Sequence, residues 1–257
     1  MFNDGESRRE ARVRWQGTAT IWLLVINALV FVCQNLAERY YPGFPVNPYF
    51  ALSLDGLQHG FVWQLFTYQF MHGGFWHIFL NSWAIFVFGR AVEATIGAKR
   101  VLKVYLLSGI VGGLVQIMGT WLLPSLFGDS WVVGASAGAF GLVAAFAVLY
   151  PNERLFLLLF FIIPLRMKAT TLLWLSVAMA VFGIILPAIA PFVPHQLANS
   201  DLFSNVAHAA HLGGIATGYL FARRLLRGYR PLSPMIEPPP IIQTGAKSSL
   251  KITPVSD

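Results

Sequence analysis

Residues suited to nucleophilic catalysis occur inside strongly apolar segments of this chain. Ser136 and His211 lie in two such segments, and a serine hydroxyl becomes a useful nucleophile when a nearby histidine takes its proton. His77 and Asn81 are four residues apart in a third, so a helix would place both on one face. Their side chains could donate hydrogen bonds to a developing oxyanion, as could the Ser136 amide near the positive end of its helix. The pattern predicts acyl transfer.

A third catalytic member is not apparent. Of the 11 acidic residues, Asp55, Asp129 and Asp201 fall in predicted loops and Glu93 falls near the opposite end of its segment. A Ser136–His211 dyad is therefore expected rather than a triad.

A metal site on His72, His77 and His211 is the alternative chemistry. The H-x-x-x-x-H spacing of His72 and His77 does not put both side chains on one helix face, and no H-E-x-x-H motif occurs. We expect no metal and no cofactor. His208 is interpreted as a helix-packing histidine or as a residue near the mouth of the site.

The elements that carry these residues are predicted to be membrane helices. The chain is 56% hydrophobic and 11% charged, so its apolar surface exceeds what one soluble core could bury. Cys33 is the only cysteine, which excludes an intramolecular disulfide. We predict an all-α membrane protein with six spans of roughly 20 residues: Ala19–Ala37, Phe75–Arg90, Val101–Leu123, Val132–Tyr150, Ala169–Ala190 and Val206–Leu226.

Charge placement predicts the orientation. With the N-terminus in the cytoplasm, all of the 18 Lys and Arg residues except Arg39 lie on the cytoplasmic side, which indicates an N-in, C-in arrangement. Anionic lipid head groups are the expected neighbours of these cations, and nucleic acid is not an expected partner. The predicted organisation is a basic tail (1–18), a six-helix membrane domain (19–227) and a Pro-rich disordered tail (228–257).

The candidate site residues lie at one depth. At ~1.5 Å per residue, His77, Ser136 and His211 lie ~20, ~21 and ~18 Å from the cytoplasmic ends of their spans. This level is roughly 10 Å below the outer edge of a ~30 Å hydrocarbon core.

Small residues indicate which spans touch. The fourth span has small residues on nearly every face, from Gly134 onward, so it should be a central helix with neighbours on all sides. Gly214 and Gly218 form a G-x-x-x-G pair, and His211 precedes Gly214 by three residues on the same face. His211 should therefore face the fourth span.

Two other segments have no spanning role. The loop between the first two spans, residues 39–71, is rich in aromatic residues and should pack against the bundle at the membrane interface. Leu155–Ile163 is apolar but too short to span, and we interpret it as an interfacial segment on the cytoplasmic side.

Taken together, these motifs resemble the rhomboid intramembrane proteases over roughly residues 63–226. The sequence His72–Gly–Gly–Phe–Trp–His77–Ile–Phe–Leu–Asn81 is similar to that family's H-x-x-x-x-H-x-x-x-N pattern, and Gly89 to Glu93 is similar to its G-x-x-x-E. Gly134–Ala–Ser136 and the run Ala210–His211 to Gly218 complete the set.

The resemblance implies a rhomboid six-helix bundle with a short central fourth helix, and an intramembrane serine endopeptidase. It implies Ser136 as nucleophile, His211 as general base, His77 and Asn81 as oxyanion donors, and His72 as a brace for the outer loop. The substrates would be transmembrane proteins cut near the outer ends of their spans through an acyl-enzyme. A multi-pass protein of a bacterial inner membrane is the expected localisation.

One departure concerns the outer loop, where Gln64 follows Trp63 although many family members have arginine there. The alternative function is that of a non-catalytic relative that binds membrane clients. Such relatives lose the serine or the histidine, and this chain has both.

Overall fold

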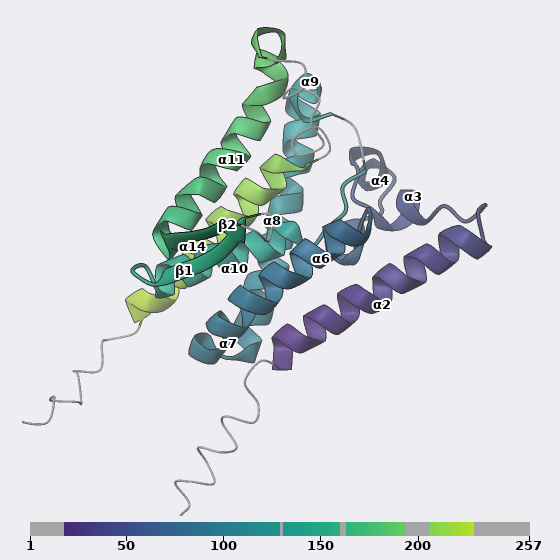
Figure 1. Ribbon diagram of the computed structural model, residues 1–257. Helices are drawn as coiled ribbons and strands as arrows, with labels where there is room; N and C mark the ends of the chain where they lie inside the picture. Colours follow the sequence, from purple (N-terminus) through teal and green to yellow (C-terminus); the bar gives the residue numbers. More distant parts are fainter. Residues whose placement is uncertain (1–17, 129–130, 160–162, 194–205, 229–257) are drawn as a thin grey trace, which may run out of the picture.

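The chain folds into a bundle of helices with one small hairpin at its edge (Figure 1). Figure 1 shows a computed structural model that describes residues 18–128, 131–159, 163–193 and 206–228. The elements are α2 (Thr18–Tyr40), α3 (Val46–Phe50), α4 (Leu54–Gln58), α5 (Gln64–Thr67), η1 (Tyr68–Phe70), α6 (Phe75–Ala84), η2 (Ile85–Gly89), α7 (Arg90–Ile96), α8 (Ala98–Leu122), α9 (Pro124–Phe127), α10 (Ser136–Leu149), β1 (Arg154–Leu159), β2 (Ile163–Lys168), α11 (Ala169–Ile189), η3 (Ala190–Phe192) and α14 (His208–Gly228).

Four helical segments in the described part of the chain are long and apolar enough to cross a membrane. They are Thr18–Tyr40, Phe75–Ile96, Ala98–Leu122 and Ala169–Phe192. Helix α10 has 14 residues, which spans only ~21 Å, and α14 contains three arginines near its end. The prediction of a multi-pass membrane protein agrees with these helices, whereas six spans and the N-in orientation stay predictions.

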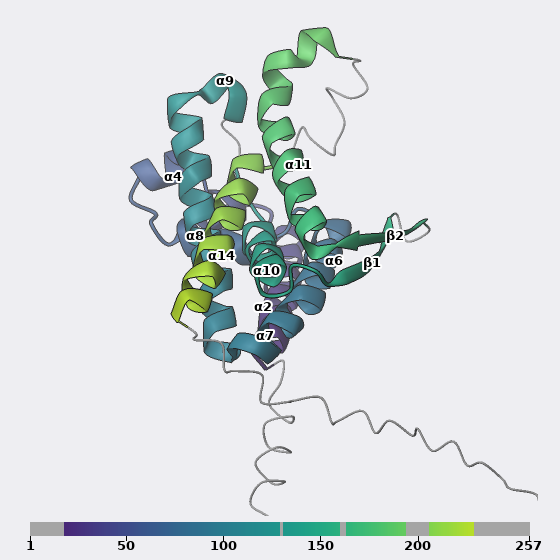
Figure 2. The same cartoon turned by 90° about the vertical axis from the view of Figure 1, so that its left-hand side faces the viewer.

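Helix α10 lies at the centre of the bundle. Nearly all of its residues from Ala137 to Ala147 are buried. Helices α8, α14 and α11 pack around it (Figure 2), and η2 and α7 also contact it. Alanine and glycine dominate this helix, which allows close approach from several directions at once. The predicted central position of the fourth span is confirmed.

The predicted boundaries of the fourth span were too wide at its start. Residues 131–134 are not helical, and Leu52 and Val132 form an isolated antiparallel bridge with N···O distances of 3.0 and 2.8 Å. This bridge ties the outer loop to the segment that leads into α10. The last helix likewise begins at His208, two residues later than predicted.

The aromatic outer loop packs against the bundle, as predicted. Tyr68 is fully buried and its hydroxyl donates a 2.6 Å hydrogen bond to the carbonyl of Gly109 in α8. In return, the hydroxyl of Tyr105 in α8 donates to the carbonyl of Gln69 at 3.2 Å. Two reciprocal tyrosine bonds thus fix the end of the loop to α8.

The prediction of an all-α chain is wrong between α10 and α11. Strands β1 and β2 pair antiparallel, from Arg154 opposite Lys168 to Leu159 opposite Ile163, and the hairpin projects from the bundle beside the start of α11 (Figure 2). Each apolar run is too short for a span but long enough for a strand. Pro164 is compatible with pairing because, in a two-stranded sheet, both strands are edges.

The start of α2 is held by a buried carboxylate on α7. Glu93 accepts hydrogen bonds from the backbone amides of Ala19 and Thr20, both at 2.9 Å, and from the Thr20 hydroxyl at 2.6 Å. A carboxylate at this position satisfies amides that the helix itself leaves free and complements the helix dipole. The start of α2 and the end of α14 lie toward the same side of the bundle as α7 (Figure 1). The two predicted tails, apart from Thr18 and Gly228, lie outside the described residues, as do Asp129 and Asp201.

Candidate active site

Ser136 is the first residue of α10, and an extended segment delivers it there. The amide of Gly134 donates a 2.9 Å hydrogen bond to the carbonyl of Tyr68 in the outer loop. Together with the Leu52–Val132 bridge, this bond fixes the chain immediately before the serine. The Ser136 amide is one of the first in its helix, where backbone N–H groups have no intrahelical acceptor.

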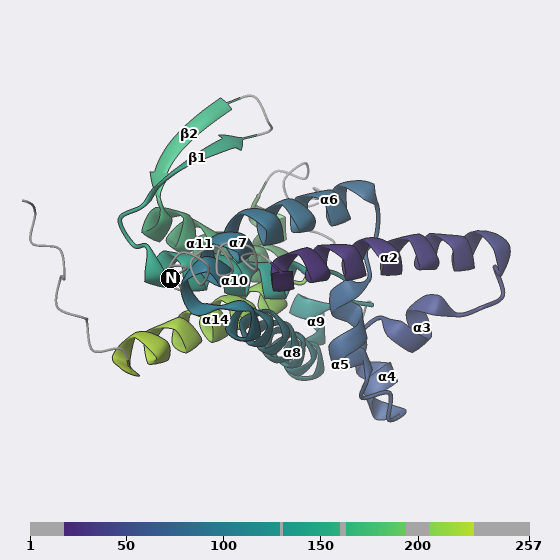
Figure 3. The ribbon, with the colours of Figure 1, turned by 90° about the horizontal axis from the view of Figure 1, so that it is seen from below.

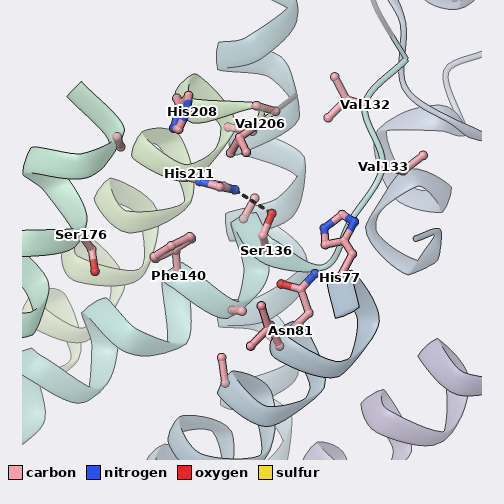
Figure 4. Close-up of a pocket in the computed structure, with 18 of the residues that line it drawn as sticks. His77, Asn81, Val132, Val133, Ser136, Phe140, Ser176, Val206, His208 and His211 are labelled. Carbon is pink, nitrogen blue, oxygen red and sulfur yellow. Dashed lines mark hydrogen bonds between the residues drawn. The ribbon is translucent and has the colours of Figure 1, made fainter. Parts of the chain in front are cut away.

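The structure brings Ser136 and His211 together. Nε2 of His211 lies 2.8 Å from Oγ of Ser136 (Figure 4). A serine hydroxyl that donates to this nitrogen requires the imidazole proton on Nδ1. The ring of Phe140, one turn along α10 from the serine, lies 4.6 Å from the His211 ring and limits its movement. The pair has the geometry required for proton transfer from nucleophile to base.

Glycines in α14 allow this approach. A β-carbon at Gly214 would clash with the carbonyl oxygen of Ala137, and one at Gly218 would clash with that of Gly141. Both carbonyls belong to the backbone of α10, so the two helices are in direct main-chain contact below the dyad. The predicted contact between the fourth and sixth spans is confirmed.

His77 and Asn81 line the other side of the serine, on α6 (Figure 4). The amide of Gly73 donates to Nδ1 of His77 at 3.4 Å. Because Nδ1 accepts, the proton of a neutral imidazole is on Nε2. That nitrogen lies over Gly134, where a β-carbon would be 2.7 Å away. A backbone φ of +133° at Gly134 also favours glycine.

Asn81 carries an unused hydrogen-bond donor. Its side chain is buried, and Nδ2 has no hydrogen-bond partner within the described part of the chain. Buried donors are normally satisfied, so this one is free to donate to a group that enters the cavity. Two side-chain hydrogen-bond donors, His77 and Asn81, thus border the cavity that contains Ser136.

His72 lies before α6, in contact with His77 but outside the cavity that holds the dyad. The rings of His72 and His77 are 5.2 Å apart. The amide and carbonyl of His72 bond to the side-chain amide of Gln34 in α2, at 3.2 and 3.1 Å. Burial, followed by the effect of His77, lowers the pKa of His72 to about 4, so this side chain is neutral at pH 7. Its geometry fits the predicted role of a brace for the outer loop.

The cavity around the dyad has a volume of about 520 Å³. Apolar side chains from α6, α10, α11 and α14 form most of its wall, and Ser136 lies between His211 on one side and His77 and Asn81 on the other (Figure 4). The polar lining residues are His77, Asn81, Ser136, Ser176, His208 and His211. No cluster of three or more metal-ligating residues is present among the residues that the structure describes.

Comparison with known proteins identifies the family. Residues 59–228, more than half of the chain, match the Rhomboid domain. The chain belongs to the rhomboid family. It is 42% identical over 100 residues to the rhomboid protein YdcA of Bacillus subtilis, covering 38% of this chain and 47% of that protein. It is 29% identical over 126 residues to the rhomboid protease GlpG of Klebsiella pneumoniae, covering 46% of this chain and 44% of GlpG.

The names of the matched rhomboid relatives include both proteases and an inactive protein. The inactive RHOMBOID-like protein 8 of Arabidopsis thaliana is 30% identical over 84 residues, which cover 33% of this chain and 22% of that protein. In each of these alignments the chain spans less than half of the relative's length. Membership of the rhomboid family therefore does not by itself establish catalysis for this chain.

Some residues of the rhomboid site were not predicted from the sequence. Gln34, which holds His72, is one of three buried polar residues in α2. Burying a polar side chain in a membrane helix is costly, and that cost is itself a signal of a functional or structural partner. The backbone of Tyr68, which anchors Gly134, gives no signal in the sequence because the interacting atom is a carbonyl.

Proposed function

We propose that this rhomboid chain is an intramembrane serine endopeptidase with a Ser136–His211 dyad. The observation that supports this most strongly is the 2.8 Å contact between Oγ of Ser136 and Nε2 of His211, in a cavity bordered by the unpaired amide of Asn81. No carboxylate is hydrogen-bonded to His211 within the described residues, which favours a dyad over a triad.

Each step follows from the position of one group. Oγ of Ser136 attacks the substrate carbonyl while Nε2 of His211 takes the hydroxyl proton. The tetrahedral oxyanion accepts hydrogen bonds from Nε2 of His77, Nδ2 of Asn81 and the Ser136 amide. His211 then returns the proton to the leaving amine, which leaves an acyl-enzyme on Ser136. Water, deprotonated by His211, attacks this ester and regenerates the serine.

The proposed substrates are transmembrane proteins cut near the outer ends of their spans. With the N-terminus in the cytoplasm, as the distribution of cations indicates, the dyad lies in the outer half of the bilayer. A bacterial inner membrane is the proposed location, and membrane lipids are the proposed surroundings. A substrate helix must unwind locally before cleavage, because its carbonyls are engaged in backbone hydrogen bonds. Helix α11, which forms one wall of the cavity, is the proposed gate.

A serine-directed fluorophosphonate probe tests this proposal. Labelling is expected on wild type and not on Ser136→Ala. A transmembrane substrate should remain uncut by Ser136→Ala, by His211→Ala and by the double variant to the same degree, because residues that act as one unit are not additive. A chelator should change nothing. Substantial cleavage by Ser136→Ala would exclude this mechanism, and an unlabelled, inactive wild type would indicate a non-catalytic relative.

A further inference from the structure

A second cavity, separate from the catalytic one, lies between α2 and the outer loop. This groove has a volume of about 560 Å³. One wall consists of α2 residues that include Ile26, Val30 and Cys33, and the other contains Phe66 and Met71 of the loop. In Figure 3, α2 runs past α3 and α5, the loop elements that border this space.

The amide and hydroxyl side chains that line the groove already have hydrogen-bond partners within the protein. They belong to Gln34 and Thr67. Both ends of the Gln34 amide are bonded to the backbone of His72, at 3.2 and 3.1 Å, and the Thr67 hydroxyl donates to the carbonyl of Phe50 at 2.7 Å. An occupant would therefore meet mainly hydrocarbon and aromatic surface, which selects a hydrocarbon ligand.

The location of the groove determines which hydrocarbon is available. Helix α2 is long and apolar enough to span a membrane, and Ile26 and Leu29 on this wall are 40% and 59% exposed. In a bilayer these surfaces contact acyl chains, not water. A helical segment ~10 Å across would need on the order of 400 Å³ per turn, so this groove could hold little more than one turn.

We propose that the groove binds one acyl chain of a phospholipid from the leaflet on the side of the active site. The bound chain packs between α2 and the residues Phe70 and Met71, which directly precede His72. Since Gln34 connects α2 to the backbone of His72 across the end of this groove, the lipid supports the same stretch of loop that positions His77.

Photo-crosslinking tests this site on the intact chain. The protein is placed in vesicles of phosphatidylethanolamine and phosphatidylglycerol that contain a tracer phospholipid with a diazirine in one acyl chain, and labelled peptides are mapped by mass spectrometry. We expect residues 26–37 and 66–71 to be labelled at least five-fold more than the exposed face of α6 around Trp76, which is 66% exposed and does not line the groove. Uniform labelling around the bundle would overturn the proposal.

The only cysteine provides a block that requires no mutation. Cys33 is exposed and lines the groove. Octyl methanethiosulfonate would convert its thiol to a mixed disulfide, releasing methanesulfinate, and would fill the groove with a tethered eight-carbon chain. Labelling of residues 66–71 should fall at least five-fold and return after dithiothreitol. Undiminished labelling of the modified protein would overturn the proposal.

Two variants complete the experiment. Cys33→Trp should reduce labelling in the same way, whereas Val32→Trp, at a 53% exposed position that does not line the groove, should not. The site does not depend on catalysis, so Ser136→Ala should retain wild-type labelling. Loss of labelling in Val32→Trp to the level of Cys33→Trp would argue against a specific groove.

Discussion

Nε2 of His77 lies so close to Gly134 that a β-carbon at this position would be 2.7 Å from the imidazole nitrogen. The contact joins α6 to the segment that precedes Ser136. It explains why glycine is required two residues before the serine in this chain, independently of any helix-packing role. The same glycine has a φ of +133°, which side chains rarely adopt.

Gly134→Ala should displace His77 and reduce turnover. Since loss of one oxyanion donor typically costs on the order of 10²- to 10³-fold in turnover, we expect kcat to fall by about that amount. Gly60→Ala is the matched control, because Gly60 has a φ of +84° and no atom within 4 Å of the added carbon. Equal losses in both variants would mean that backbone strain, not displacement of His77, is responsible.

Asn81→Ala should separate function from stability. Nδ2 of Asn81 is buried without a hydrogen-bond partner among the described residues, so its removal gives up little stabilisation and leaves no new donor unpaired. We expect kcat to fall ~10²-fold or more, with an unchanged or higher midpoint of thermal unfolding and a small change in KM. A raised KM with normal kcat would instead assign Asn81 to substrate binding.

The site illustrates what the sequence predicts well. Ser136 and His211 were expected to meet because hydropathy places them at one depth and because Gly214 and Gly218 mark a close helix contact. Both signals are local and periodic. The Leu52–Val132 bridge was not predicted, since pairing between distant short segments leaves no periodic trace. The hairpin after α10 was missed because short apolar runs do not distinguish a strand from a helical segment.

The outer loop shows how a substitution within the family pattern is accommodated. Gln64 lies at the position where the resemblance led us to expect arginine. It is fully buried: Oε1 accepts from the amide of Ser53 at 3.1 Å, and Nε2 donates to the carbonyl of Pro48 at 2.8 Å. One neutral side chain therefore satisfies one donor and one acceptor of the loop backbone.

Gln64→Arg should destabilise this chain. The Gln64 amide already contacts Gly56 so closely that a β-carbon there would clash with it, and arginine has no acceptor group for the Ser53 amide. We expect a loss of about 1–3 kcal/mol in unfolding free energy, measured by denaturant titration. Gln58→Arg, at an exposed position of α4, is the control and should be neutral. A stabilised Gln64→Arg variant would show that the loop rearranges around the larger side chain.

Glu93→Ala should loosen the start of α2 without touching the catalytic cavity. The change leaves the amides of Ala19 and Thr20 and the Thr20 hydroxyl without their shared acceptor. Unpaired buried donors cost about 1–3 kcal/mol each, so a total loss of about 2–4 kcal/mol in unfolding free energy is expected after partial rehydration. Glu153→Ala, at an exposed position between α10 and β1, should have little effect. Comparable losses in both variants would contradict a specific role for Glu93.

Gly218→Ala should weaken catalysis from two helical turns away. A β-carbon at Gly218 would clash with the carbonyl oxygen of Gly141, so α14 must move away from α10, and this movement lengthens the Ser136–His211 contact. We expect kcat to fall at least ten-fold and unfolding free energy to fall by about 1–3 kcal/mol. Ala216→Val, which adds bulk on the exposed face of α14, is the control.

Because the atom that obstructs a β-carbon at Gly218 belongs to the backbone, no truncation of a facing side chain should restore activity to Gly218→Ala. Rescue of Gly218→Ala by such a truncation would show that the helices are held apart by side chains rather than by direct main-chain contact.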